Sequence, residues 1–101
     1  MSESVVAGVG APHFLIHNEG DHVGVAVQDV DPGRRRAVYL DSDREVEIDV
    51  TETVPLGHKV ALKAMREGDT VIEYGHDIGK VVAPIQIGQH VHVHNLKTKR
   101  W

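Results

Sequence analysis

A turn signature recurs along this chain and constrains its fold more than any other feature. Each copy places an apolar residue three positions before a glycine, and an apolar run follows soon after. Glycine at the fourth place suits turns that need a positive φ or an uncrowded backbone. Short apolar runs between such turns predict a compact all-β domain. The copies are Val30-Asp31-Pro32-Gly33, Val54-Pro55-Leu56-Gly57, Met65-Arg66-Glu67-Gly68 and Ile85-Gln86-Ile87-Gly88.

The runs between the turns predict short strands, because valine and isoleucine carry the apolar content and both residues favour strands. Residues 45–50 alternate cleanly, so that Val46, Ile48 and Val50 share one face. Residues 59–63 fit either a strand or a helical turn, and little helix is expected elsewhere. The other predicted strands are 14–17, 23–27, 37–40, 71–74, 79–82 and 90–94.

The length of 101 residues suits one domain with a modest core. Residues 1–12 are small and apolar without a basic start, and we interpret them as a flexible N-terminal tail rather than a signal peptide. Residues 13–101 form the predicted domain. No apolar run approaches the length of a membrane span, so we expect a cytoplasmic protein that does not act at a membrane.

Charge and cysteine content exclude some functions. Eleven Lys and Arg against fifteen Asp and Glu give a formal net charge of −4, which argues against a nucleic-acid-binding protein. The basic run 34–36 is expected to be a solvated turn. The chain has no cysteine, so disulfides and thiolate metal sites are excluded.

Histidines are concentrated in the run Gln89-His90-Val91-His92-Val93-His94-Asn95. In an extended strand, alternate residues point the same way, so His90, His92 and His94 would share a face opposite Val91 and Val93. Neutral imidazole is a common ligand of transition metals, which makes the three histidines candidate metal ligands. Half-buried or surface histidines opposite a valine face explain the pattern equally well.

Two further motifs combine glycine with titratable groups. The first, Pro55-Leu56-Gly57-His58-Lys59, offers an imidazole and a fixed cation that suits a carboxylate or sulfonate. The second, Tyr74-Gly75-His76-Asp77-Ile78-Gly79, would let a ligand approach the backbone closely. An ordinary polar turn and a hairpin loop are the simpler interpretations. The scattered histidines 13, 17 and 22 are expected to be structural or solvated.

Three segments of the chain, taken in their order along the sequence, resemble a known family. The segments 57–62, 67–79 and 88–95 look like the SAF-type β-clip domain of altronate/galactarate dehydratases, and the resemblance runs from about Phe14 to the end. The ending 94–101 is most similar to the family's free-standing small subunits, including those of sulfolactate sulfo-lyases. The resemblance implies a β-clip fold and a large catalytic subunit as partner, with Trp101 as a candidate interface anchor.

The resemblance also implies a chemistry. The family's substrates are small anionic 2-hydroxy acids that lose a proton from C2 and a group, water or sulfite, from C3. A divalent metal, iron or manganese, is implied as cofactor, held either by this chain or by the large subunit. His92 and His94 are then the predicted catalytic residues. The predicted substrate-binding residues are His58, Lys59, Tyr74, Gly75 and Asn95.

Two other functions remain open at this point. The resemblance also extends to the SAF-like domains that occur on sialic-acid-synthase-type enzymes and antifreeze-like proteins, where they mostly bind or gate. In that case the histidines would shape a lid and transfer no proton. Alternatively, the chain is a stand-alone metal-binding protein that uses the His-x-His-x-His face.

Overall fold

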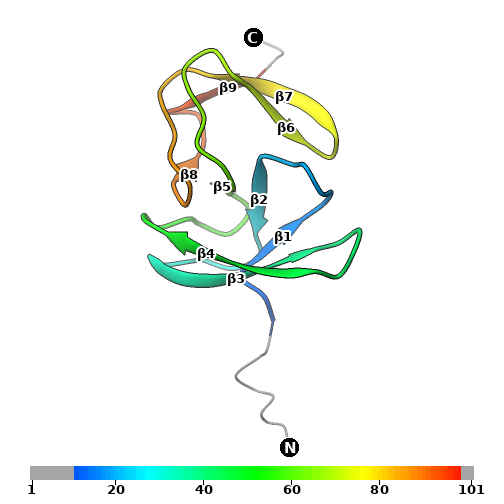
Figure 1. Cartoon of the computed structure of the whole chain (residues 1–101). Coiled ribbons are helices and arrows are strands. Elements are labelled where there is room, and N and C mark those ends of the chain that lie inside the picture. The colour runs from blue at the N-terminus through cyan, green and yellow to red at the C-terminus, as the bar shows by residue number, and fades with distance from the viewer. Residues whose placement is uncertain (1–10, 99–101) are drawn as a thin grey trace, which may run out of the picture.

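The computed structural model describes residues 11–98, which contain nine strands and no helix (Figure 1). Within these residues, no helix is long and apolar enough to cross a membrane. The strands are β1 (Phe14–Ile16), β2 (Val23–Ala26), β3 (Gly33–Tyr39), β4 (Glu45–Val50), β5 (Lys59–Ala61), β6 (Thr70–Glu73), β7 (His76–Val81), β8 (His90–Val91) and β9 (Leu96–Thr98). The predicted all-β class is therefore confirmed.

The strands form two sheets. A six-stranded sheet has the order β4-β3-β1-β2-β5-β8, and a smaller sheet has the order β6-β7-β9. Figure 1 shows the small sheet at one end of the domain and β3 and β4 at the other, with β2, β5 and β8 between them. All pairings are antiparallel except β1 with β3.

Two apolar clusters hold the sheets together. The first lies within the large sheet and includes Phe14, Ile16, Ile48 and Val60. The second joins the two sheets, because residues of β2, β5 and β8 pack against residues of β6, β7 and β9. Strand β5 serves both clusters: Val60 belongs to the first and Ala61 to the second. Adjacent strand residues point to opposite faces, which explains why this strand is apolar on both faces.

Strand β4 confirms the prediction made from alternation. Ile48 and Val50 are buried and Val46 packs against the same core. The sequence left a strand or a helical turn possible for residues 59–63. The structure has a strand there, β5, over Lys59–Ala61.

The prediction for the basic run 34–36 was wrong. These arginines lie on β3, where the outer carboxylates of β4 provide partners: Arg34 pairs with Glu47 and Asp49, and Arg36 with Glu45. Opposite charges across an antiparallel pair stabilise it, so the run extends the strand.

Three of the four recurring glycines form the predicted turns, whereas Gly33 is the first residue of strand β3. Gly57, Gly68 and Gly88 all have positive φ, and the N–H of the next residue in each turn donates to the carbonyl two residues before the glycine. A sequence echo between 19–23 and 67–71 reflects one turn geometry, since Asp21 and Asp69 each accept the N–H three residues earlier. Turn chemistry alone accounts for this repeat.

Gly88 has the strictest requirement. A Cβ at this position would collide with the carbonyl oxygen of Asp49, and the Gly88 carbonyl accepts the Thr51 N–H. The turn therefore lies directly against the end of β4, and this contact fixes where β8 begins with His90.

Candidate functional site

The end of the β5–β8 ladder brings distant histidines together. Val60 is paired with His90, and Lys59 with Val91. Continuing this antiparallel register by one step places His58 across from His92. Side chains of opposed residues lie on the same side of a sheet, so the imidazoles of His58, His90 and His92 gather on one side.

We call His58, His90, His92 and His94 the histidine cluster. Nδ1 of His58 lies 2.8 Å from Nε2 of His90, close enough for one nitrogen to donate a hydrogen bond to the other. The His58 and His92 rings stack with centroids 4.0 Å apart, and the His90 and His94 rings are 5.3 Å apart. His58 and His90 are half-buried, whereas His92 and His94 are exposed. The cluster is therefore open to solvent on one side.

The environment of the cluster favours neutral imidazole. Burial lowers the pKa of His90 below its ordinary value, and the charges of His58, His94 and His92 lower it further. The pKa of His92 is lowered by burial and by the nearby charges of His58, His94 and Lys59. Neutral imidazole is the form that accepts a proton or binds a metal ion.

The prediction that residues 90–94 form one strand was wrong. Strand β8 ends at Val91, and the chain then turns through residues 92–95 into β9, which the sequence analysis did not predict. Val91 is buried as expected, but Val93 is 68% exposed. A valine face opposite the histidines therefore does not extend beyond Val91.

Asn95 holds this turn in place. Its side chain is buried, its Oδ1 accepts the His92 N–H, and its Nδ2 donates to the His90 carbonyl. These backbone partners fix which end of the amide is nitrogen. The second Nδ2 hydrogen points to Nε2 of His94 at 3.1 Å, so the neutral His94 ring accepts at Nε2 and carries its proton on Nδ1.

Two sets of three potential metal ligands include His90. One consists of His58, His90 and His92, and the other of Glu52, His90 and His94; in each set the donor atoms lie within 4.8 Å of one another. The predicted set of His90, His92 and His94 is not among the groups found in residues 11–98. The set that contains His90 and His92 has His58 as its third member, and His94 belongs to the set with Glu52. Glu52, in the segment between β4 and β5, was missed, since nothing in its sequence context connects it to the histidines.

A second polar group, the carboxylate cluster, consists of Asp21 and Glu73. Both are buried, at 7% and 3% exposure. Glu73 Oε1 lies 3.9 Å from the Lys59 ammonium. Burial raises the pKa of Glu73 and so does the Asp21 charge, whereas Lys59 and His17 oppose this increase. Lys59 is thus turned toward the carboxylates, while its neighbour His58 belongs to the histidine cluster.

Tyr74 and Gly75 lie at the carboxylate cluster rather than at the histidine cluster. They form the two-residue loop between β6 and β7, and both have positive φ, as a type I′ hairpin requires. The Asp21 carboxylate accepts both of their N–H groups. The Tyr74 ring packs on His17 with centroids 3.8 Å apart. The hairpin interpretation of this motif is therefore confirmed.

Asp21, Glu73 and the contact of His17 with Tyr74 were not predicted from the sequence. The repeat of residues 19–23 and 67–71 could have drawn attention to Asp21, but it did not indicate burial. His22 fits the structural role expected for it, since its Nδ1 accepts the Ile72 N–H. Trp101 lies outside the described residues.

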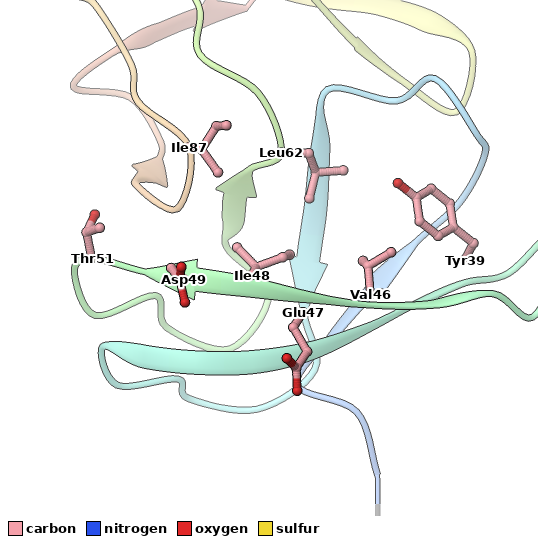
Figure 2. Close-up of a pocket in the computed structure, with 8 residues that line it drawn as sticks. All are labelled: Tyr39, Val46, Glu47, Ile48, Asp49, Thr51, Leu62 and Ile87. Atoms are coloured by element: carbon pink, nitrogen blue, oxygen red, sulfur yellow. The ribbon is translucent and has the colours of Figure 1, made fainter.

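A groove of about 530 Å³ lies elsewhere, along β4 (Figure 2). Its lining combines apolar side chains with the carboxylates of Glu47 and Asp49 and contains no lysine, arginine or histidine. An anionic ligand would meet like charge there, so the histidine cluster is the better candidate for anion chemistry.

Comparison with known proteins identifies relatives. The family model of the altronate/galactarate dehydratase SAF domain matches residues 12–99. A (2R)-sulfolactate sulfo-lyase subunit alpha of Chromohalobacter salexigens is 46% identical over 90 residues, which is 87% of this chain and 96% of that protein. A protein of the same name from Paracoccus pantotrophus is 65% identical over 48 residues, which is 48% of this chain and 72% of that protein.

A longer relative carries the same segment. The altronate dehydratase of Bacillus subtilis is 40% identical over 85 residues, which is 84% of this chain but only 16% of that enzyme. Together with the match over residues 12–99, these relatives show that the chain belongs to the altronate/galactarate dehydratase SAF domain family.

Proposed function

We propose that this chain is the small subunit of a two-chain lyase that removes sulfite from a sulfolactate-type 2-hydroxy acid in the cytoplasm. The observation that carries the proposal is the similarity to a protein named (2R)-sulfolactate sulfo-lyase subunit alpha over 96% of that protein's length. Altronate dehydratases match through only 16% or 15% of their length. Elimination of water from a sugar acid is the alternative.

The reaction sets clear chemical requirements. A base removes the proton from C2, the C3–sulfur bond breaks with its electron pair going to sulfite, and the resulting enol becomes a 2-oxo acid. The C2 proton is weakly acidic, so a base and stabilisation of developing negative charge are both needed. Sulfite leaves without protonation, whereas hydroxide would need a general acid.

His94 is the residue of this chain that we expect to contact the substrate. With Asn95 donating to its Nε2, the neutral ring offers one N–H donor at Nδ1. A neutral imidazole that donates a hydrogen bond can stabilise a developing oxyanion without transferring its proton. We therefore assign His94 as a donor to the anionic substrate rather than as an acid.

His92 keeps the acid/base role only in the metal-free chain. Its ring stacks on His58, and within residues 11–98 no hydrogen bond occupies its ring nitrogens. Burial and the nearby charges lower the pKa of His92, which favours the neutral ring, the form that accepts a proton.

Lys59 stands between the two clusters and suits an anion as a fixed cation. Its contact with Glu73 at 3.9 Å is an ion pair that is too long for a hydrogen bond. Among residues 11–98 no acceptor occupies the ammonium, so its N–H donors are available to an anion. Tyr74 and Gly75 contribute by forming the hairpin turn that Asp21 holds. Asn95 contributes by donating a hydrogen bond to the ring of His94.

The family resemblance implies a divalent metal, and the imidazoles and the Glu52 carboxylate are donor types that bind iron or manganese. Such a metal, on this chain or on the large subunit, supplies Lewis-acid stabilisation of the carboxylate and hydroxyl oxygens.

Reconstitution tests the proposal. The chain is expressed with and without a large subunit of the sulfo-lyase type, and sulfite and 2-oxo acid release from sulfolactate are measured. We expect activity only when both chains are present. Activity of the large subunit alone would leave this chain a gating module at most, and release of 2-oxo acid from altronate but not from sulfolactate would favour the dehydratase alternative.

A further inference from the structure

We propose that His58, His90 and His92 form a divalent transition-metal site on this chain, from which His94 and Glu52 are excluded. The inference rests on the proposed function only in its choice of a metal-dependent reaction. It concerns which residues bind an ion, and it can be tested on this chain alone.

The donor nitrogens of the three histidines converge on one point. Nitrogens of His58, His90 and His92 lie within 4.8 Å of one another, and the shortest pair is 2.8 Å apart. Two imidazole nitrogens this close cannot both carry a proton, so at least one lone pair faces the other ring. A metal ion takes the place of the shared proton when both lone pairs turn to it.

Hydrogen-bonded backbone holds all three histidines in position. His90 is paired with Val60 in the β5–β8 ladder, and His58 directly precedes β5. His92 follows β8 in a turn that Asn95 holds through the His92 N–H. Sites supported by strands and hydrogen-bonded turns hold ligands more accurately than free loops do. The three rings are thus placed before any ion binds.

The alternative set of ligands, Glu52, His90 and His94, is excluded by the hydrogen bond of His94. His94 Nε2 accepts from Asn95 Nδ2, and the amide cannot rotate because its oxygen and its other hydrogen serve the backbone at His92 and His90. His94 therefore keeps its proton on Nδ1 and has no free lone pair. Glu52 then shares only His90 with the remaining set, which leaves too few ligands for a site of its own.

The donor set selects the class of ion. Imidazoles suit zinc, iron, copper and nickel, whereas magnesium and calcium take oxygen ligands. Three protein ligands leave at least one coordination position open for water or substrate. With an ion bound, His92 would be a ligand rather than a base, and His94 would keep its Nδ1 donor outside the ligand set.

The experiment is titration of the isolated, folded chain with Co(II) and Zn(II), followed by calorimetry and by the visible absorption of Co(II). We expect one-to-one binding with the absorption of a site bound by nitrogen. The variants His58→Ala, His90→Ala and His92→Ala should each weaken binding by more than about 10-fold, a loss that even outer-shell changes can produce.

Three control variants complete the test: Glu52→Ala, His94→Ala and His76→Ala, the last in an exposed residue of β7. All three should bind as the unchanged chain does, with circular dichroism confirming the fold of every variant. Absence of saturable binding, unchanged binding in His58→Ala, or loss of binding in Glu52→Ala overturns the assignment. A chain that binds no metal but still supports turnover with its partner refutes only this site, whereas metal binding without such turnover refutes only the proposed function.

Discussion

The two polar clusters use their side chains in opposite ways. In the carboxylate cluster, Asp21 is buried and accepts three backbone N–H groups, those of Asn18, Tyr74 and Gly75. In the histidine cluster, the rings contact mainly one another, and two of them are exposed. A side chain that accepts hydrogen bonds from buried backbone N–H groups stabilises the fold. An imidazole whose ring nitrogens are not engaged by the backbone can instead bind a ligand or transfer a proton. Asn95 belongs to both kinds, because it holds a turn and orients a histidine.

Replacing Asp21 should have the largest effect on stability. Asp21→Ala leaves three N–H groups without their acceptor, and hydrogen bonds to a charged group are strong, so we expect a loss of about 3 kcal/mol in the free energy of unfolding. Urea denaturation measures it. Asp69→Ala is the matched control and should cost about 1 kcal/mol. Asp69 occupies the same place in a related turn, but within the described residues 11–98 its side chain accepts only the Arg66 N–H. Equal losses would refute the distinction.

The second largest effect is expected at Asn95. Asn95→Ala removes an acceptor of the His92 N–H and a donor to the His90 carbonyl, which should cost about 2 kcal/mol. It also frees Nε2 of His94, so ¹⁵N NMR should show loss of the Nδ1-protonated form. Gln89→Ala, which removes a single exposed contact to the Gln86 N–H, should leave the His94 spectrum unchanged. A His94 tautomer unaltered in Asn95→Ala would show that the amide does not set it.

Glu73 should give a smaller effect that depends on pH. Its pKa is raised in the folded chain above the ordinary value of 4.5, chiefly by burial, so folding is opposed by ionised Glu73. This opposition is absent below the unfolded pKa and appears as pH rises through the folded pKa. Glu73→Gln should therefore gain stability relative to the unchanged chain as pH rises from 4 to 7, by less than the loss in Asn95→Ala. Thermal unfolding across this range measures the difference, and a difference that falls with pH would contradict the assignment.

The histidines should matter least for stability. His92→Ala and His94→Ala remove exposed rings, so the free energy of unfolding should change by less than about 0.5 kcal/mol. Urea denaturation beside Asp21→Ala gives the direct comparison. A loss above about 2 kcal/mol for either histidine would mean that the cluster is part of the fold rather than a site.

Patterns local in sequence predicted the fold well. Alternation in β4 and glycine in the turns act within a few residues. The alternation was confirmed, and so were three of the four predicted glycine turns. The basic run was misassigned because its partners, the carboxylates of β4, come from a different segment. Strand β8 was predicted too long, because the side-chain capping by Asn95 that ends it is not visible in an alternating pattern.

The candidate site was only partly predictable. His90, His92 and His94 were identified from spacing, but they gather through a turn, and the ring nearest to His90 belongs to His58, 32 residues away. Lys59 and Tyr74 were grouped with the histidines, yet each has its contacts at the carboxylate cluster. Glu52 and Glu73 gave no signal, because proximity and burial arise from tertiary packing.

The central claim is that the histidine cluster serves the elimination reaction through His94. Steady-state turnover of sulfolactate by the proposed two-chain enzyme tests it, with His94→Ala compared with His76→Ala, a change outside both clusters. We expect kcat to fall by about 100-fold in His94→Ala, the loss typical of removing one donor to a developing oxyanion, and to stay near the unchanged value in His76→Ala. An unchanged kcat in His94→Ala, with both chains still assembled, would contradict the account.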